Sequence, residues 1–139
     1  MADVLTELAA KLNHKLALID DRPGGLIVKW TYAELEANAN RLARLLIALG
    51  VQPKDRIVSC GQNSCWLVAM TNAVRKIGAV GVPLNYRLTP DEATYVVDNS
   101  DAVVVFSGSS GNVGSRPSLR PSWRLRSWPK SLFPCPWGG

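Results

Sequence analysis

The sequence of 139 residues is long enough for one domain with a hydrophobic core, and its 47% apolar and 19% charged residues are typical of a globular protein. The net charge of +5 lies entirely in the last 32 residues, which excludes a broadly basic surface for nucleic acid on the rest of the chain. With no long apolar run, no secretory leader and an odd number of cysteines, the sequence predicts no membrane span and a cytoplasmic location.

The first 30 residues predict a helix followed by a β-hairpin. Residues 4–12 suit a short helix. Apolar stretches at 17–20 and 26–30 flank the turn Asp21–Gly25, in which Pro23 fixes φ and the glycines permit positive φ. The two stretches therefore predict a pair of antiparallel strands.

A longer helix is predicted directly after the hairpin. Thr31 and Glu34 have the spacing of a capping box, in which each side chain accepts a hydrogen bond from a free backbone N–H. Apolar residues then recur every three or four positions until Gly50, as on one face of a helix that ends at a glycine. These apolar residues are Leu35, Ala39, Leu42, Leu46 and Leu49.

From residue 51 onward, apolar strands alternate with helices. A second capping box, Thr89 with Glu92, and Pro90 at the first helical position mark the start of the last helix. This alternation predicts an α/β fold in which the hairpin is followed by parallel βαβαβ units, with ligands beyond the carboxyl ends of the strands. The expected elements are a strand at 56–60, a helix at 64–77, a strand at 79–84, a helix from 89 to about 99, and a strand at 102–106.

The composition changes abruptly after Phe106. Residues 108–139 hold seven Ser, five Pro, five Gly, five Arg or Lys and three Trp, but no Asp or Glu. The prolines would break any helix or strand, and such a segment buries too little apolar area to offset its chain entropy. We therefore expect a folded part at 1–107 and a basic, disordered tail at 108–139. The tail also resembles out-of-frame translation of GC-rich DNA.

Two stretches of the folded part contain motifs of a known enzyme family. Trp30-Thr-Tyr-Ala-Glu-Leu35 resembles the first core motif of the adenylate-forming, AMP-binding enzymes. Residues 73–92 resemble the second core motif, in the form found in fatty-acyl-CoA synthetases. The resemblance extends over residues 5–106 and implies part of the N-terminal subdomain of that fold. The residues that match the scaffold motifs are Thr31, Tyr32, Glu34, Gly78, Pro83 and Asn85.

The resemblance also implies a chemistry. Full-length members of the family use ATP and Mg²⁺ to convert a carboxylic acid into an acyl-adenylate, from which coenzyme A then displaces AMP. In the family, the phosphate loop, the Mg²⁺ ligand, the ribose-binding aspartate and the catalytic lysine all lie after the point that corresponds to residue 107. The resemblance therefore implies no catalytic residue, no metal ligand and no bound cofactor in this chain.

Three features are weighed as binding candidates. Arg87 follows a strand end, and the resemblance to the family implies that it would face a phosphate of coenzyme A, although most exposed arginines are only solvated. Ser107–Gly111 resembles a phosphate loop, but we expect a linker because no lysine and no helix follow it. Trp66 and Met70 have the spacing of a core-facing helix side rather than of an acyl tunnel.

Three functions are compatible with these observations. The first is a truncated, inactive acyl-CoA synthetase. The second is half of a split synthetase that a second chain completes. The third is a small binding protein whose basic tail contacts an anion. The gene sequence distinguishes the three functions. The rest of the enzyme would follow in another reading frame for a truncated synthetase and in an adjacent gene for a split synthetase. It would be absent for a small binding protein.

Overall fold

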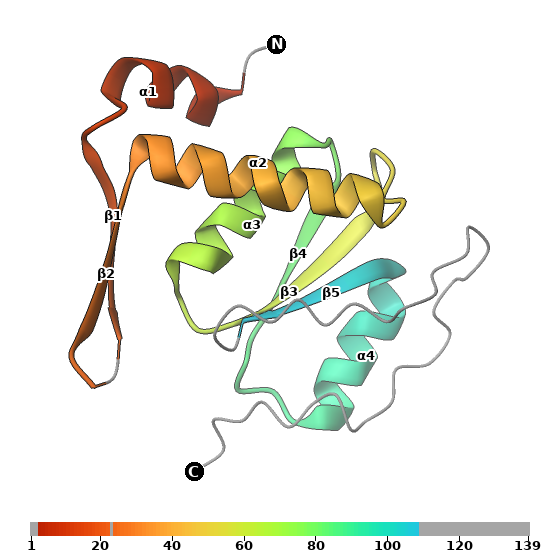
Figure 1. The fold of residues 1–139 in the computed structure, drawn as a ribbon. Coiled ribbons are helices and arrows are strands. Elements are labelled where there is room, and N and C mark those ends of the chain that lie inside the picture. The colour runs from red at the N-terminus through yellow and green to blue at the C-terminus, as the bar shows by residue number, and fades with distance from the viewer. Residues whose placement is uncertain (1–2, 23, 109–139) are drawn as a thin grey trace.

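The computed structural model describes residues 3–22 and 24–108 of the chain (Figure 1). Every predicted helix and strand is present, and most ends differ only slightly from the predicted ones. The predicted tail, except for Gly108, lies outside the described residues. The bounds are α1 Val4–Leu12, β1 Leu16–Arg22, β2 Leu26–Thr31, α2 Tyr32–Ala48, β3 Arg56–Gly61, α3 Cys65–Lys76, β4 Val80–Leu84, α4 Pro90–Ser100 and β5 Ala102–Gly108.

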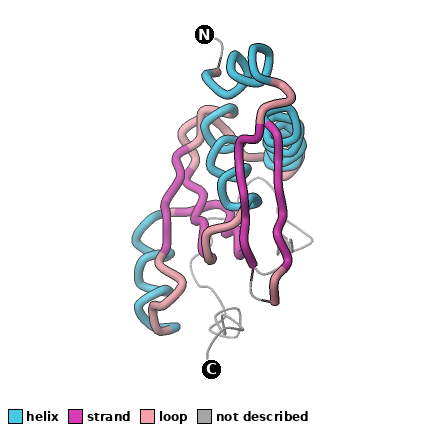
Figure 2. The backbone as a smooth tube through the Cα atoms, turned by 90° about the vertical axis from the view of Figure 1, so that its left-hand side faces the viewer, coloured by secondary structure: helices cyan, strands magenta, loops and turns pink. Residues whose placement is uncertain are grey.

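Strands β1 and β2 form an antiparallel hairpin at one side of the molecule, separate from the other strands (Figures 1 and 2). Leu18 pairs with Trp30, and both side chains pack against the larger hydrophobic core. Trp30 also meets Trp66 of α3 edge to face, with ring centroids 5.0 Å apart. A two-stranded hairpin alone is only marginally stable, so its position depends on these contacts.

The remaining strands form a parallel sheet in the order β4-β3-β5. Helix α3 connects β3 to β4 and α4 connects β4 to β5, which confirms the predicted βαβαβ units. Neighbouring residues of the central strand face opposite sides of the sheet: Ile57 packs with α2 and α3, and Val58 packs with α4. Both side chains are fully buried, as expected for a parallel sheet that helices cover on both faces.

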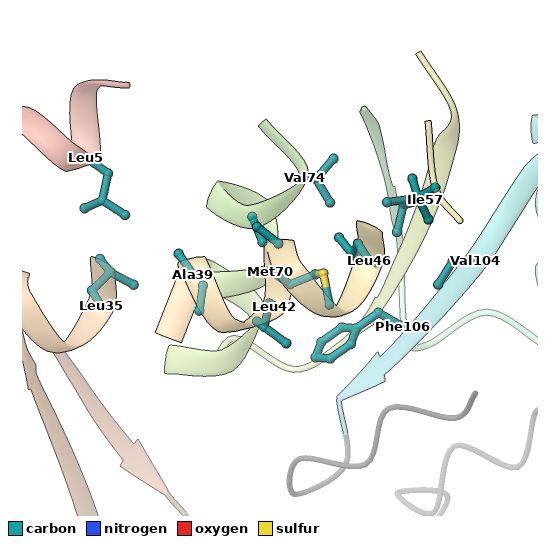
Figure 3. Close-up of a cluster of buried hydrophobic side chains, with 14 residues drawn as sticks. Leu5, Leu35, Ala39, Leu42, Leu46, Ile57, Met70, Val74, Val104 and Phe106 are labelled. Atoms are coloured by element: carbon teal, nitrogen blue, oxygen red, sulfur yellow. The ribbon is translucent and has the colours of Figure 1, made fainter. Parts of the chain in front are cut away.

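The larger core lies between the sheet and helices α2 and α3 (Figure 3). Phe106 of β5 points toward Met70 of α3 and Leu42 of α2, and all three side chains are buried. Helix α1 joins this core through Leu5, which lies beside Leu35 at the start of α2. The apolar stripe predicted along α2 therefore faces the core.

A cluster of polar groups that no sequence pattern predicts joins α1, α2 and α3. The Lys76 Nζ atom lies 2.9 Å from Asp3 Oδ2 and 2.9 Å from Glu36 Oε2, and it donates a hydrogen bond to Thr6 Oγ1 at 2.9 Å. Thr6 and Asn40 donate to Glu36 Oε1 at 2.9 and 3.0 Å. The Lys76 side chain is 10% exposed, so the cluster is largely screened from water.

The polar cluster shifts the pKa values of Glu36 and Lys76 toward their ionised forms. Burial raises the pKa of Glu36, but the hydrogen bonds from Lys76, Thr6 and Asn40 outweigh it and hold the pKa below the ordinary 4.5. Burial likewise lowers the pKa of Lys76, and Asp3 and Glu36 together raise it above 10.5. Glu36 and Lys76 therefore form an ion pair at neutral pH.

Candidate functional site

The carboxyl ends of the three parallel strands meet at one edge of the sheet, which is where open α/β sheets bind ligands. Cys60 of β3 is in register with Leu84 of β4 and with Ser107 of β5. Beyond this edge lie the N-terminus of α3, residues 85–88 and the N-terminus of α4. This carboxyl edge is therefore the place to look for a site.

The N-terminus of α3 is occupied by side chains of the chain itself. Asp20 of the hairpin is only 9% exposed, and its Oδ2 atom accepts a hydrogen bond from the backbone N–H of Cys65 at 3.1 Å. The Ser64 hydroxyl accepts from the N–H of Leu67 at 3.2 Å. A carboxylate at this position also compensates the positive end of the helix dipole, which would otherwise attract an anion.

Removing the Asp20 carboxylate is expected to destabilise the fold. Asp20→Ala leaves the buried N–H of Cys65 without this acceptor, so we expect the free energy of unfolding to fall by about 1–2 kcal/mol. Urea unfolding, monitored by circular dichroism, measures this free energy of unfolding. Asp98→Ala, which removes an exposed carboxylate from α4, is the matched control and should change the free energy by less than about 0.5 kcal/mol. Equal effects of the two substitutions would contradict the role given to Asp20.

The N-terminus of α4 likewise has its own carboxylate. Glu92 Oε2 accepts from the N–H of Thr89 at 2.8 Å, and the Thr89 hydroxyl accepts from the N–H of Glu92 at 3.4 Å, which confirms the second capping box. The hydrogen bond from the Thr89 backbone, followed by that from its hydroxyl, lowers the pKa of Glu92. Asp91 adds a second acidic residue to the same turn. An anionic ligand would meet negative charge at this helix end.

Between these helix ends, residues 85–87 form a local turn. The Asn85 side-chain oxygen accepts a hydrogen bond from the backbone N–H of Arg87 at 3.0 Å. The Arg87 guanidinium carbon lies 5.4 Å from the centroid of the Tyr86 ring, a cation–π distance. Arg87 is exposed. The ring contact accounts for its orientation, and its contact with a coenzyme A phosphate stays a prediction.

Comparison with known proteins agrees with this arrangement. A sequence model of the AMP-binding enzymes matches residues 5–127, which is most of the chain. The chain belongs to the AMP-binding enzyme family. The matched range extends beyond Phe106, where the composition of the chain changes, to residue 127.

The relatives of this AMP-binding family member are much longer than it is. A crotonobetaine/carnitine–CoA ligase of Escherichia coli strain UTI89 is 33% identical over 103 residues, which cover 74% of this chain but 20% of the relative. The N-terminal domain of FACL13 from Mycobacterium tuberculosis superposes with a TM-score of 0.70 at 32% identity, over 76% of this chain and 26% of that domain. A fatty acyl CoA synthetase of the same organism superposes with a TM-score of 0.69 at 33% identity. The superposition covers 76% of this chain and 20% of the synthetase. These likenesses confirm an N-terminal part of an acyl-CoA synthetase fold.

The residues that match the AMP-binding family's scaffold motifs do not converge on one site. Thr31 and Glu34 cap α2, with the N–H of Thr31 donating to Glu34 Oε2 at 2.7 Å, which lowers the pKa of Glu34. Gly78 ends α3 at φ +72°, a left-handed conformation that favours glycine. Tyr32 is half-buried against the larger core. Pro83 of β4 pairs with Ser59 of β3, and Asn85 forms the turn described above.

The structure tests the interpretations of Trp66 with Met70 and of the Ser107–Gly111 stretch. Met70 is 1% exposed and Trp66 packs on Trp30, so both belong to the core, as expected. Ser107 and Gly108 are part of β5, where they pair with β3, so the expected linker does not begin at Ser107. The pairing of β5 with the buried β3 extends the strand beyond its apolar residues. Residues 109–111 lie outside the described part.

The described residues do not fit the cofactors that the AMP-binding family uses. Within residues 3–22 and 24–108 there is no group of three or more His, Cys, Asp or Glu that could hold a metal ion such as Mg²⁺. At the carboxyl edge, Asp20 and Ser64 accept hydrogen bonds from backbone N–H groups of α3, and Glu92 accepts one at the start of α4, so a phosphate of ATP would have to compete with these side chains. In the same part of the chain, no helix is long and apolar enough to cross a membrane.

Proposed function

We propose that this chain is the N-terminal scaffold segment of an acyl-CoA synthetase and that it forms no acyl-adenylate by itself. The chain spans about a fifth of the length of the curated relatives that it matches. In the complete enzymes, activation of a carboxylic acid with ATP and transfer of the acyl group to coenzyme A would need the remaining four fifths. Because the three cysteines of the sequence are odd in number and form no Cys-x-x-Cys pair, we place the chain in the reducing cytoplasm.

The observation that supports this proposal is the occupation of the carboxyl edge by the chain's own carboxylates. Phosphoryl and adenylyl chemistry depends on positioned positive charge and N–H donors around the nucleotide. At this edge Asp20 and Glu92 occupy both helix N-termini, and Arg87 is the cationic side chain of the turn between them. This arrangement supports a scaffold role for the described residues rather than a nucleotide site.

The isolated chain is expected to give no fatty-acid-dependent exchange of labelled pyrophosphate into ATP. The assay uses purified full-length chain with Mg²⁺ and fatty acids of several chain lengths. A complete acyl-CoA synthetase under the same conditions is the positive control. Exchange above background that disappears in a Ser109→Ala, Ser110→Ala double variant would overturn the proposal, because it would make the Ser/Gly stretch a functioning phosphate loop.

A second candidate is half of a split synthetase. Strands β4 and β5 are the outer strands of the parallel sheet, and neither has a further strand partner among the described residues. An unpaired strand edge can accept a strand from another chain. If an adjacent gene encodes the remaining part of the enzyme, co-expression of the two chains should give a stable complex with exchange activity. Chains that purify separately would exclude this candidate.

A further inference from the structure

The hairpin has an exposed face that takes no part in the carboxyl edge. Ile19 pairs with Lys29 and Asp21 pairs with Ile27, so these four side chains lie on one face of the hairpin. We call them the hairpin outer face. Figure 2 shows the molecule from the side on which the hairpin lies.

The exposure of the hairpin alternates between its two faces. On the inner face, Leu18 and Trp30 pack against the larger core and Asp20 is bound to α3. On the outer face, Ile19 is 62% and Ile27 is 54% exposed. Ile19 and Ile27 thus form a small exposed apolar pair on the face of the hairpin that points away from the core.

The four residues form a rectangle with like residues at opposite corners. Paired residues lie about 5 Å apart across the strands, and residues two positions apart lie about 7 Å apart along a strand. Ile19 and Ile27 therefore occupy one diagonal, and Asp21 and Lys29 occupy the other. The charges are opposite and lie on the two sides of the apolar diagonal.

We propose that the hairpin outer face binds the same face of a second copy of this chain. A two-fold axis along the apolar diagonal places Ile19 on Ile19 and Ile27 on Ile27 of the other copy. The same rotation exchanges the two sides of the diagonal, so Lys29 of each copy meets Asp21 of the other. A two-fold axis along the strands, or one across them, would instead place a charged side chain on an isoleucine. The charge pattern thus selects one self-complementary arrangement.

The size of the face sets the strength of this dimer. Four side chains bury far less than the roughly 800 Å² per partner of a stable interface, so the dimer should form only at high protein concentration. We expect sedimentation equilibrium on the full-length chain to show a shift from monomer to dimer over roughly 10 µM to 1 mM.

A charge exchange tests the arrangement directly. Asp21→Lys alone, or Lys29→Asp alone, puts like charges opposite one another in the homodimer, and each should weaken the association about tenfold. A mixture of these two single variants restores both opposite-charge contacts and should associate as the unchanged chain does. The double variant Asp21→Lys, Lys29→Asp should do so as well. Self-association of the single variants at the unchanged level, or a mixture no tighter than either variant alone, would overturn the proposal.

The apolar diagonal is tested separately. Ile19→Ser with Ile27→Ser should abolish the dimer, whereas Tyr95→Ser should leave it unchanged, because Tyr95 is 70% exposed on α4, outside the hairpin. Circular dichroism confirms that each variant is folded. If the Ile19→Ser, Ile27→Ser variant dimerises like the unchanged chain, another surface mediates association and the proposal fails. A chain that stays monomeric throughout the concentration range contradicts it too.

Discussion

Replacing Lys76 with alanine is expected to lower the free energy of unfolding by about 3 kcal/mol, because it leaves buried carboxylates without their cation. Lys76 contacts Asp3 of the segment before α1 and Glu36 of α2 at 2.9 Å each. It also donates a hydrogen bond to Thr6 of α1. The substitution therefore loosens α1 from the rest of the fold. Urea unfolding gives the free energy, and hydrogen exchange of the α1 amides shows where the loss occurs.

Arg75→Ala is the matched control, since Arg75 is the preceding residue of α3 and its side chain is exposed. It should change the free energy of unfolding by less than about 0.5 kcal/mol. The Lys76 effect should also depend on pH. The pKa of Glu36 is lowered in the folded state, so its stabilising contribution is complete above pH 4.5 and is lost as the pH falls through the lower, folded-state pKa. A Lys76→Ala variant that kept the acid sensitivity of the unchanged chain would show that other carboxylates cause it.

Phe106→Ala is expected to cost about 4 kcal/mol, the largest effect of any single substitution that we consider. Phe106 is 1% exposed and packs beside Met70 and Leu42, so truncation leaves a cavity between β5 and helices α2 and α3. A domain of this size has a total stability of roughly 5–15 kcal/mol, so the variant should be partly unfolded at 37 °C and bind a dye for apolar surface. Thermal unfolding and dye fluorescence measure both effects.

Ile47→Ala is the control for Phe106→Ala, since Ile47 is 60% exposed on α2. It should leave the midpoint of thermal unfolding nearly unchanged. A Phe106→Ala variant that unfolds at the temperature of the unchanged chain would mean that β5 contributes little to the core. That result would also weaken the description of β5 as an integral strand of the sheet.

The features that could be predicted from the sequence are those that depend on neighbouring residues. Both capping boxes involve residues three positions apart, and the stripe of α2 repeats every three or four, so each is visible in a short window of sequence. The parallel sheet followed from the alternation of strands and helices. The predicted end of β5 lies two residues too early, because Ser107 and Gly108 lack strand propensity and are held in the strand by pairing with β3.

The features that sequence reasoning missed join residues far apart in the chain. Asp20 meets Cys65 across 45 positions, and Lys76 meets Glu36 across 40. No local pattern distinguishes these charged residues from the solvated ones around them. A partial signal existed for Asp20, because the alternation of the hairpin places it on the same face as Leu18. At the candidate site, Arg87 could be located from its position after a strand, but its ring contact with Tyr86 could not.

The hydrogen bond between Asp20 and the N-terminus of α3 has a thermodynamic consequence. An incoming phosphate group and the Asp20 carboxylate would compete for the same N–H of Cys65. Competition of this kind is reciprocal. If the docked hairpin lowers the affinity for phosphate by some factor, bound phosphate lowers the equilibrium constant for docking of the hairpin by the same factor. Any anion that did bind at α3 would therefore be sensed some distance away, as increased freedom of strands β1 and β2.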